Sequence, residues 1–313
     1  MVNKTPENLL LIFIDGIGFG TKNRSLNPFA RYETRFFSSL GGGTHKDVPG
    51  RLFEVDATMG VKGLPQSGTG QTALFTGYNA AQIMDRHVAG FPPYSLRPYL
   101  KEHSILHKFL ESGYEASLIN AYTETYMKRI SGPRSERLMS ASTLMQKGTG
   151  RPFLNEADLR ENRSIFMDIT HWILRRFIKD IPTKDPKERG RTLVKIARNY
   201  DLSIFEYFLA DRIGHEGIWN EGEMILRHLD EFLSGIWEDL DKENQCVVIC
   251  SDHGNFEDLS NGLHTDNLTP LFVYGKNETM FDESIKSLYD IPRRIYQWKN
   301  IPFSTKVPEV ELG

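Results

Sequence analysis

Five short runs rich in apolar residues predict the strands of a buried sheet. They are LLLIFI (9–14), EASLIN (115–120), SIFEYFLA (203–210), CVVIC (246–250) and PLFVYG (270–275). Short, nearly continuous apolar runs are typical of strands that are covered on both faces. The chain is therefore expected to build its core around a central sheet.

Amphipathic helices are predicted between some of these runs. In residues 220–244 apolar side chains recur at helical spacing, with Asn220 as the expected N-cap and Glu223 at the capping-box position. A second helix is expected from Ser104 to Gly113, before the run at 115. Strands that alternate with helices predict an α/β fold with a largely parallel sheet.

Composition places the chain among ordinary soluble globular proteins. Hydrophobic residues make up 39% and charged residues 25% of its 313 residues, which is enough for one large domain or two small ones. The 38 basic and 41 acidic residues give a net charge of −3. Nucleic-acid and membrane surfaces are therefore not expected partners, because such binders usually carry a basic excess. The oligomeric state cannot be inferred from these features.

The two cysteines and the N-terminus point to a cytoplasmic protein. Cys246 and Cys250 lie on one predicted strand, about 13 Å apart, which is too far for a disulfide. Free thiols fit a reducing compartment. The N-terminal segment lacks the pattern of a secretory signal, and no apolar run approaches the length of a membrane span.

Acidic and histidine residues stand at the edges of the predicted strands. They are Asp15 after the first run, Asp211 and His215 after the third, Asp252 and His253 after the fourth, and His264 before the fifth. In α/β sheets, ligands bind outside the carboxyl ends of the strands. Divalent transition metals favour imidazole nitrogen combined with carboxylate oxygen. Six such side chains are too many for one tetrahedral ion and suit a pair of ions.

The stretch GLPQSGTGQTALFTG (63–77) is the expected source of a nucleophile. A glycine-rich turn carrying Ser67 and Thr69 runs into a short predicted helix. The free N–H groups at a helix N-terminus favour an anionic group beside them. A Ser or Thr hydroxyl there, held by a metal ion, would lose its proton more readily and could attack phosphorus.

The pattern resembles the alkaline phosphatase superfamily, and most closely the metalloenzyme domain of cofactor-independent phosphoglycerate mutase. DGIGFG at 15 is similar to that family's D-G-x-G element, DRIGH at 211 to its D-x-x-G-H, DHGN at 252 to its D-H-G-N, and HTDNLTPLFVYG at 264 to its H-T-x-N-x-x-P segment. Each element alone is weak, but the four occur in the family's order between residues 15 and 275.

The resemblance implies a ligand set for two divalent metal ions, Zn²⁺ or Mn²⁺. One ion would be held by Asp211, His215 and His264. The other would be held by Asp15, Asp252, His253 and the nucleophile. TGQTA (69–73) is similar to the S-x-x-T-A turn of alkaline phosphatases, which implies Thr69 as both nucleophile and ligand, with Ser67 as the alternative.

The resemblance also implies the fold and a domain organisation. We expect a three-layer α/β sandwich of the alkaline phosphatase type, formed by residues 1–313 as a single metalloenzyme domain. Phosphoglycerate mutases carry a large inserted cap, and the stretch between Thr69 and Asp211 is too short for that cap. Residues 86–200, rich in basic and irregular sequence, are a candidate for loops or a small lid.

The expected function is metal-dependent phosphoryl transfer. A phosphatase that hydrolyses a small phosphate ester through a phosphothreonine intermediate is the first hypothesis. A phosphomutase, a phosphodiesterase and a non-catalytic metal-binding relative are the alternatives. Arg86 and His87, which follow the nucleophile segment, are candidates for substrate contact, as is Asn120 at the end of the second run. Ordinary strand-end polarity explains Asn120 at least as well.

Overall fold

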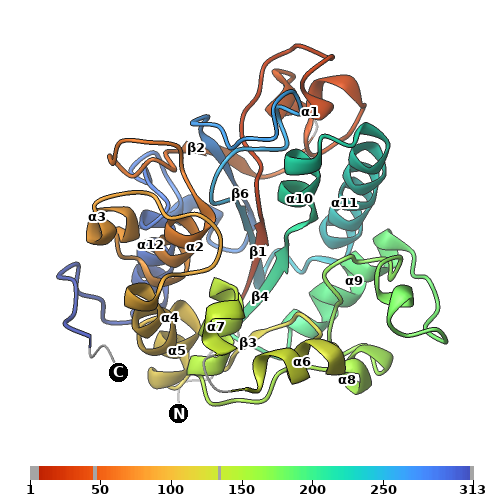
Figure 1. Cartoon of the computed structure of the whole chain (residues 1–313). Helices are drawn as coiled ribbons and strands as arrows, with labels where there is room; N and C mark the ends of the chain where they lie inside the picture. Colours follow the sequence, from red (N-terminus) through yellow and green to blue (C-terminus); the bar gives the residue numbers. More distant parts are fainter. Residues whose placement is uncertain (1–6, 45–47, 133–134, 311–313) are drawn as a thin grey trace.

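A six-stranded sheet forms the centre of the molecule (Figure 1). The computed structural model describes residues 7–44, 48–132 and 135–310. Within these ranges the spatial order of the strands is β2-β6-β5-β1-β4-β3. The strands are β1 (Asn8–Ile14), β2 (Arg51–Val55), β3 (Ala116–Leu118), β4 (Leu202–Tyr207), β5 (Gln245–Cys250) and β6 (Thr269–Gly275). Strands β1, β3, β4 and β5 are parallel, whereas β6 runs antiparallel to both β5 and β2.

Alternate residues of the central strands face two separate cores, as the continuous apolar runs predict. In β1, Leu9, Leu11 and Phe13 pack into one core, and Leu10 and Ile12 pack into the other. Every residue of β1 is buried, because helices cover both faces of the sheet. The expected three-layer α/β sandwich is confirmed.

The helices divide between the two faces of the sheet (Figure 1). One face carries α2 (Ser67–Thr76), α3 (Ala80–Met84), α4 (Arg97–Glu102), α5 (Ile105–Glu111), α7 (Ala141–Gly148) and α12 (Asp290–Lys299). The other face carries α1 (Pro28–Arg31), α9 (Pro186–Ala197), α10 (Leu209–Glu216) and α11 (Trp219–Asp239). The short helices α6 (Glu124–Ile130) and α8 (Glu156–Arg160) lie beyond β3.

Two boundaries differ from the sequence prediction. The run at 203–210 is not one strand, because β4 ends at Tyr207 and α10 begins at Leu209. Helix α11 begins at Trp219, and Ile218 is its N-cap. Asn220 therefore lies inside the first turn instead of capping it.

Residues 86–200 contribute helices and a strand to the main body instead of a large inserted cap. In its described parts this region forms α4 to α9 and β3, and α4, α5 and α7 share the core of the first face. Both cysteines are buried and unpaired. No helix in the described ranges has the length and apolar character that crossing a bilayer requires.

Candidate metal centre

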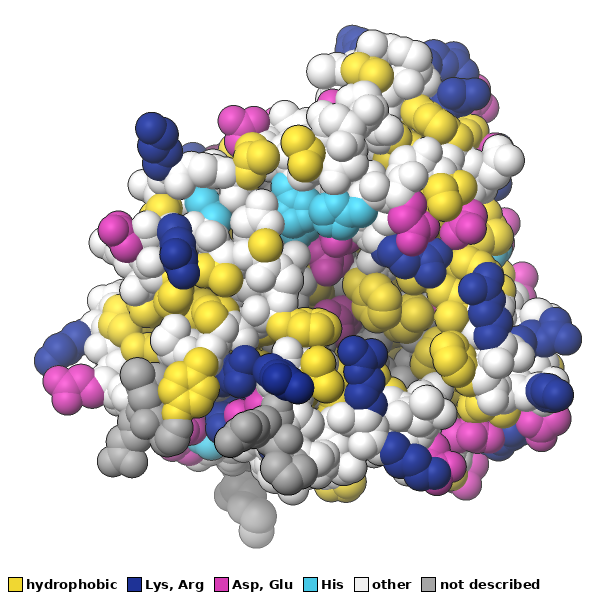
Figure 2. Space-filling view, viewed as in Figure 1, with side chains coloured by type: hydrophobic (Ala, Val, Ile, Leu, Met, Phe, Trp, Pro, Cys, Tyr) yellow, Lys and Arg dark blue, Asp and Glu magenta, His cyan; other side chains and the backbone are white. Residues whose placement is uncertain are grey.

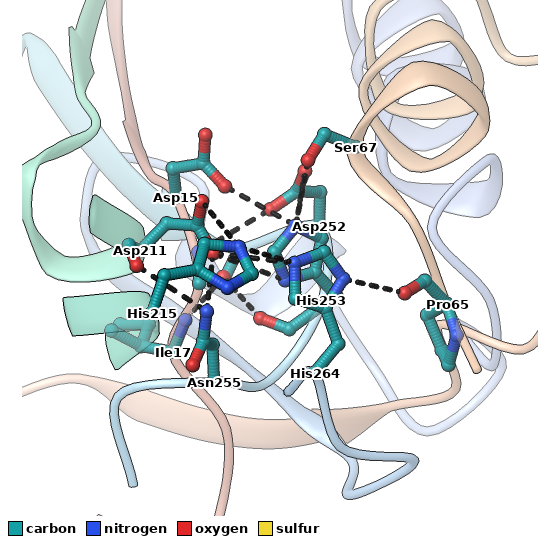
Figure 3. Close-up of polar contacts among 12 residues, drawn as sticks. Asp15, Ile17, Pro65, Ser67, Asp211, His215, Asp252, His253, Asn255 and His264 are labelled. Atoms are coloured by element: carbon teal, nitrogen blue, oxygen red, sulfur yellow. Dashed lines mark hydrogen bonds and ion pairs between the residues drawn. The ribbon is translucent and has the colours of Figure 1, made fainter. Parts of the chain in front are cut away.

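The six predicted ligands converge at one edge of the sheet (Figure 3). Asp15 directly follows β1, and Asp252 and His253 follow β5, the strand beside it. Asp211 and His215 come from α10, which begins just after β4 on the other side of β1. Because β6 is antiparallel, its beginning lies at this same edge and brings His264 to the group.

Three side chains gather around the ring nitrogen of His253. The distance from His253 Nε2 to Asp15 Oδ1 is 3.4 Å, and the distance to Asp252 Oδ2 is also 3.4 Å. Ser67 Oγ lies 3.0 Å from the same nitrogen. Ligands bound about 2.1 Å from a tetrahedral ion are about 3.4 Å from one another. The distances from His253 Nε2 to the other three groups are thus close to those between ligands of one cation.

Asp211, His215 and His264 form a second group. His215 Nε2 lies 3.4 Å from Asp211 Oδ2, and His264 Nε2 lies 3.5 Å from Asp211 Oδ1. The two groups adjoin, since the rings of His253 and His264 stack with centroids 3.7 Å apart. Figure 2 shows histidine side chains grouped beside a hollow in the surface, with acidic side chains visible inside it.

Backbone carbonyls fix the orientation of both histidines in the second group. His264 Nδ1 donates to Pro65 O at 2.9 Å, and His215 Nδ1 donates to Gly262 O at 2.8 Å. In the neutral tautomers, the lone pairs of the two Nε2 atoms then face each other at 3.1 Å. A positive charge between them, either a proton or a metal cation, removes this repulsion.

The first group fits a metal ion because its buried ligand atoms lack other partners. Asp15 Oδ1 and Asp252 Oδ2 are buried without a hydrogen-bond donor. Burial raises the pKa of Asp15 well above its ordinary value, and the carboxylates of Asp252 and Asp211 raise it further. Burial lowers the pKa of His253, which keeps the imidazole neutral. Buried charge and an unprotonated imidazole are what a divalent cation requires.

The second group also attracts positive charge. Burial alone would raise the pKa of Asp211, but contacts with His264, His253 and Asn255 outweigh it and lower the pKa to about 2. Burial likewise disfavours protonated His264, yet Asp211 and the Pro65 carbonyl raise its pKa. The Asp211 carboxylate is thus ionised. It pairs with a positive charge beside it, which is either a proton on His264 or a metal cation.

The nucleophile segment places Ser67, and not Thr69, at the centre. Ser67 is the first residue of α2 and is partly exposed. Thr69 is fully buried. Its hydroxyl donates to Gln66 O at 3.2 Å and accepts from Val88 N at 3.2 Å. Thr69 therefore connects α2 to the following loop, whereas the Ser67 hydroxyl lies beside the predicted ligand His253.

Comparison with known proteins agrees with this geometry. The Metalloenzyme superfamily model matches residues 177–298, the segment that contains five of the six ligands. The alkaline phosphatase from the Antarctic bacterium TAB5 superposes with a TM-score of 0.51 and 13% identity, covering 96% of this chain and 100% of that one. The chain thus shares the fold of alkaline phosphatases, and its segment 177–298 is similar to the Metalloenzyme superfamily.

One further structure and one sequence relative show how much of the chain is similar to known proteins. The PH0037 protein of Pyrococcus horikoshii has the same fold, with a TM-score of 0.56, 14% identity and coverage of 96% and 98% of the two chains. The 2,3-bisphosphoglycerate-independent phosphoglycerate mutase of Acetivibrio thermocellus is 31% identical over 93 residues. That match covers 28% of this chain but only 18% of the relative's length.

The predicted substrate-contact residues lie outside the two groups of predicted ligands. His87 Nε2 donates to Val61 O at 3.1 Å, and the Arg86 side chain is exposed to solvent. Asn120 exchanges two hydrogen bonds of 2.8 Å with the backbone of Glu206. Asn120 therefore joins the end of β3 to β4. This is the structural role that ordinary strand-end polarity predicts for it.

Sequence reasoning missed two residues that hold the predicted ligands in place. Gln71 Nε2 donates to Asp15 Oδ2 at 3.0 Å, one helical turn beyond Ser67. Asn255 Nδ2 donates to Asp211 Oδ1 at 2.7 Å. Asn255 could have been found from sequence, because it is the last residue of the DHGN element and lies two residues beyond His253. Gln71 has no such signal, because its role depends on how α2 meets β1.

Proposed function

We propose that the chain transfers a phosphoryl group from a small phosphate ester to the hydroxyl of Ser67, and then to water. The observation that carries this proposal is the 3.0 Å contact between Ser67 Oγ and His253 Nε2, inside a cluster of carboxylates and imidazoles. A partly exposed hydroxyl at this position is open to substrate, unlike that of Thr69.

Helix α2 supplies the anion-binding surface for the phosphate. It is ten residues long, and its first residue, Ser67, lies in the ligand cluster (Figure 3). No acidic residue occupies its first turn. Unsatisfied N–H groups and the positive end of the helix dipole both favour a phosphate oxygen.

The donor set fits two divalent cations of the zinc or manganese class, since carboxylate oxygen mixed with imidazole nitrogen suits both. Asp15, Asp252, His253 and Ser67 would hold one, and Asp211, His215 and His264 would hold the other. When bound, such ions lower the pKa of a ligated hydroxyl or water and neutralise charge on the phosphoryl group.

The proposed reaction has two displacements at phosphorus. Ser67 Oγ attacks, the bond from phosphorus to the leaving oxygen breaks, and the chain carries a phosphoserine. A water then attacks from the side that the leaving group vacated, which releases inorganic phosphate and restores Ser67. His253, whose Nε2 lies 3.0 Å from Ser67 Oγ, keeps the attacking hydroxyl in place, and Gln71 holds the neighbouring Asp15.

A phosphomutase is the second candidate, because the matched relative from Acetivibrio thermocellus is a phosphoglycerate mutase. In that case the phosphoserine would return its phosphoryl group to another hydroxyl of the substrate. Phosphate assays on a panel of phosphorylated metabolites separate the two. Release to water identifies a phosphatase, whereas an isomeric product without released phosphate identifies a mutase.

The nucleophile is tested with Ser67→Ala and its near-isosteric control Thr69→Val. With p-nitrophenyl phosphate and added Mn²⁺, we expect Ser67→Ala to lower kcat by at least about a thousandfold, as loss of a nucleophile does. Thr69→Val should retain turnover. Acid quenching of the wild-type reaction followed by peptide mass spectrometry should locate the phosphoryl group on Ser67. Phosphothreonine at 69, or full activity in Ser67→Ala, would refute the assignment.

A further inference from the structure

One buried carboxylate near the centre contacts no metal ligand directly, yet it joins the loops that carry them. Glu257 lies four residues beyond His253 and is only 2% exposed. Burying a carboxylate is costly unless its oxygens are satisfied. The hydrogen-bond donors around Glu257 therefore indicate its structural role.

Glu257 accepts four hydrogen bonds from four different residues. Oε2 receives the backbone N–H groups of Gly18 and Asn255, each at 2.9 Å. Oε1 receives the hydroxyl of Thr265 and, at 3.1 Å, the side-chain amide of Asn267. A carboxylate has about four lone-pair sites, so these neutral donors fill its accepting capacity.

The four donors come from the three loops that bear the ligands of the first group and His264. Gly18 lies three residues beyond Asp15, and Asn255 lies two beyond His253. Thr265 directly follows His264. One carboxylate thus fixes the β1, β5 and β6 loops relative to one another. It also acts on the second group, because Asn255, held through its N–H, donates its side-chain amide to Asp211.

Glycines leave the space that this carboxylate fills. A Cβ atom added at Gly18 would lie 2.6 Å from Glu257 Oε1, and one added at Gly254 would lie 2.1 Å from it. The backbone N–H of Thr265 also pairs with Gly254 O at 2.9 Å. The loops therefore approach Glu257 more closely than residues with side chains would allow.

We propose that Glu257 is a positioning residue for the metal centre, which sets the spacing of Asp15, His253 and His264 through hydrogen bonds to their loops. This proposal rests on the metal site of the proposed function. It requires that loss of the carboxylate weakens metal binding even when the protein stays folded. Residues that orient metal ligands typically contribute about 10–100-fold to metal affinity.

The test compares Glu257→Ala with Glu257→Gln and with Glu231→Ala, an exposed acid on α11. Calorimetric titration with Mn²⁺ should show affinity about 10–100-fold weaker in Glu257→Ala, and the visible spectrum of the Co²⁺-loaded protein should change. Glu257→Gln should recover most of the affinity. Its amide oxygen can accept from Gly18 and Asn255, and its NH₂ can donate to Thr265 and to a rotated Asn267.

Wild-type affinity and an unchanged Co²⁺ spectrum in folded Glu257→Ala would overturn the proposal. If that variant does not fold, Thr265→Val removes one donor from the same carboxylate and should still weaken Mn²⁺ binding. Unaltered binding in Thr265→Val would then reject the idea. Failure of the wild-type protein to bind Mn²⁺ or Co²⁺ would remove the proposed function itself, whereas a metal-binding wild type with insensitive variants would remove this inference alone.

Discussion

A buried histidine remote from the metal-binding motifs carries an unusual conformation. His171 is 1% exposed, with φ at +69°. Ile169, in the same turn, has φ at +62°, which is rare for a β-branched residue and costs roughly 1–3 kcal/mol. His171 Nδ1 donates to Pro182 O at 2.9 Å, while its Nε2 is buried without a partner. The surrounding fold therefore holds a neutral imidazole in a strained turn.

This histidine should make the free energy of unfolding fall in mild acid. Burial lowers the pKa of His171 to about 4, from an ordinary value of 6.5. Between these values the unfolded chain binds a proton that the folded chain does not. Its stabilising contribution is complete above pH 6.5 and is lost as the pH falls toward 4. From pH 7 to pH 5 the loss should be about 2 kcal/mol.

Urea unfolding at several pH values, with wild type and His171→Asn compared, checks this. Asparagine tolerates positive φ and does not titrate, so the variant should lose less stability between pH 7 and pH 5 than the wild type does. Only this pH-dependent difference matters, because the variant also loses packing at every pH. Parallel curves for the two proteins would show that His171 is not the titrating group.

At the residue scale, the positions of the predicted ligands could be inferred from sequence, but which hydroxyl lies beside them could not. Asp15, Asp252 and His253 directly follow strands, and the pleat of a strand fixes where the next residue emerges. Ser67 and Thr69 lie two residues apart on a helix, so they point to different sides of it. Which one faces the ligands depends on the rotation of α2, and no local pattern in the chain determines that rotation.

At the element scale, helices α9 and α11 cross on the second face at two glycines. A Cβ atom at Gly190 would lie 2.0 Å from Phe232 O, and one at Gly235 would lie 2.0 Å from Lys187 O. Each glycine thus lies against the backbone of the other helix. Both helices pack in the core that covers this face of β1 and β5.

Adding a methyl group at this crossing should destabilise the fold. Alanine is about 1 kcal/mol better than glycine inside an isolated helix. In Gly235→Ala, however, the methyl group meets a backbone oxygen that no rotamer change can move. We expect a net loss of about 1–3 kcal/mol, the usual cost of overpacking, measured by urea unfolding.

The matched control for this helix crossing is Gly132→Ala, where an added Cβ would have no atom within 4 Å. It should leave the unfolding midpoint nearly unchanged. Greater stability in Gly235→Ala than in the wild type would mean that α9 and α11 separate at little cost, and would argue against a close crossing.

Elements with a single clear pattern were predictable, and elements with mixed patterns were not. Strand β1 is one apolar run that is buried throughout. Strand β2, with sequence RLFEV, lies at the edge of the sheet and is only partly buried, so its pattern resembles that of a loop. The run at 203–210 stays apolar from β4 into α10, and periodicity cannot place a boundary inside a continuous apolar run. The helical position of Asp211 and His215 was missed for this reason.

At the scale of the whole molecule, the order of the strands creates the site. Strand β1 lies between β4 and β5, so the exits of three neighbouring parallel strands meet. The reversed direction of β6 adds His264 to the same edge. Sequence pattern predicts that strands exist, but the order and direction of pairing depend on contacts between distant segments. The family resemblance implied that the six predicted ligands converge, and the order and direction of the strands in the folded chain explain how they do so.

The convergence places two carboxylates at one buried point, and this gives the last prediction. Asp15 and Asp252 lie at equal distances from His253 Nε2, and Asp252 contributes to the raised pKa of Asp15. Without a cation their like charges oppose folding. In Asp15→Asn, the amide oxygen can accept from Gln71, and the amide NH₂ can donate to His253. The substitution should therefore relieve repulsion in the metal-free protein and remove a ligand from the metal-bound one.

Asp15→Asn should accordingly change thermal stability in opposite directions with and without metal. In EDTA its Tm should exceed that of the wild type, by about 2 °C for each kcal/mol of repulsion removed. With Mn²⁺ the wild type should gain about 2.7 kcal/mol at a hundredfold excess over Kd, and the variant should gain much less. Calorimetry on both proteins, with the exposed Glu243→Gln as the control for charge loss, measures these differences. Two results would show that Asp15 does not share a cation with Asp252. One is a variant that is less stable than the wild type in EDTA, and the other is a variant that Mn²⁺ stabilises as much as the wild type. Either result removes the electrostatic reason for placing the two carboxylates together.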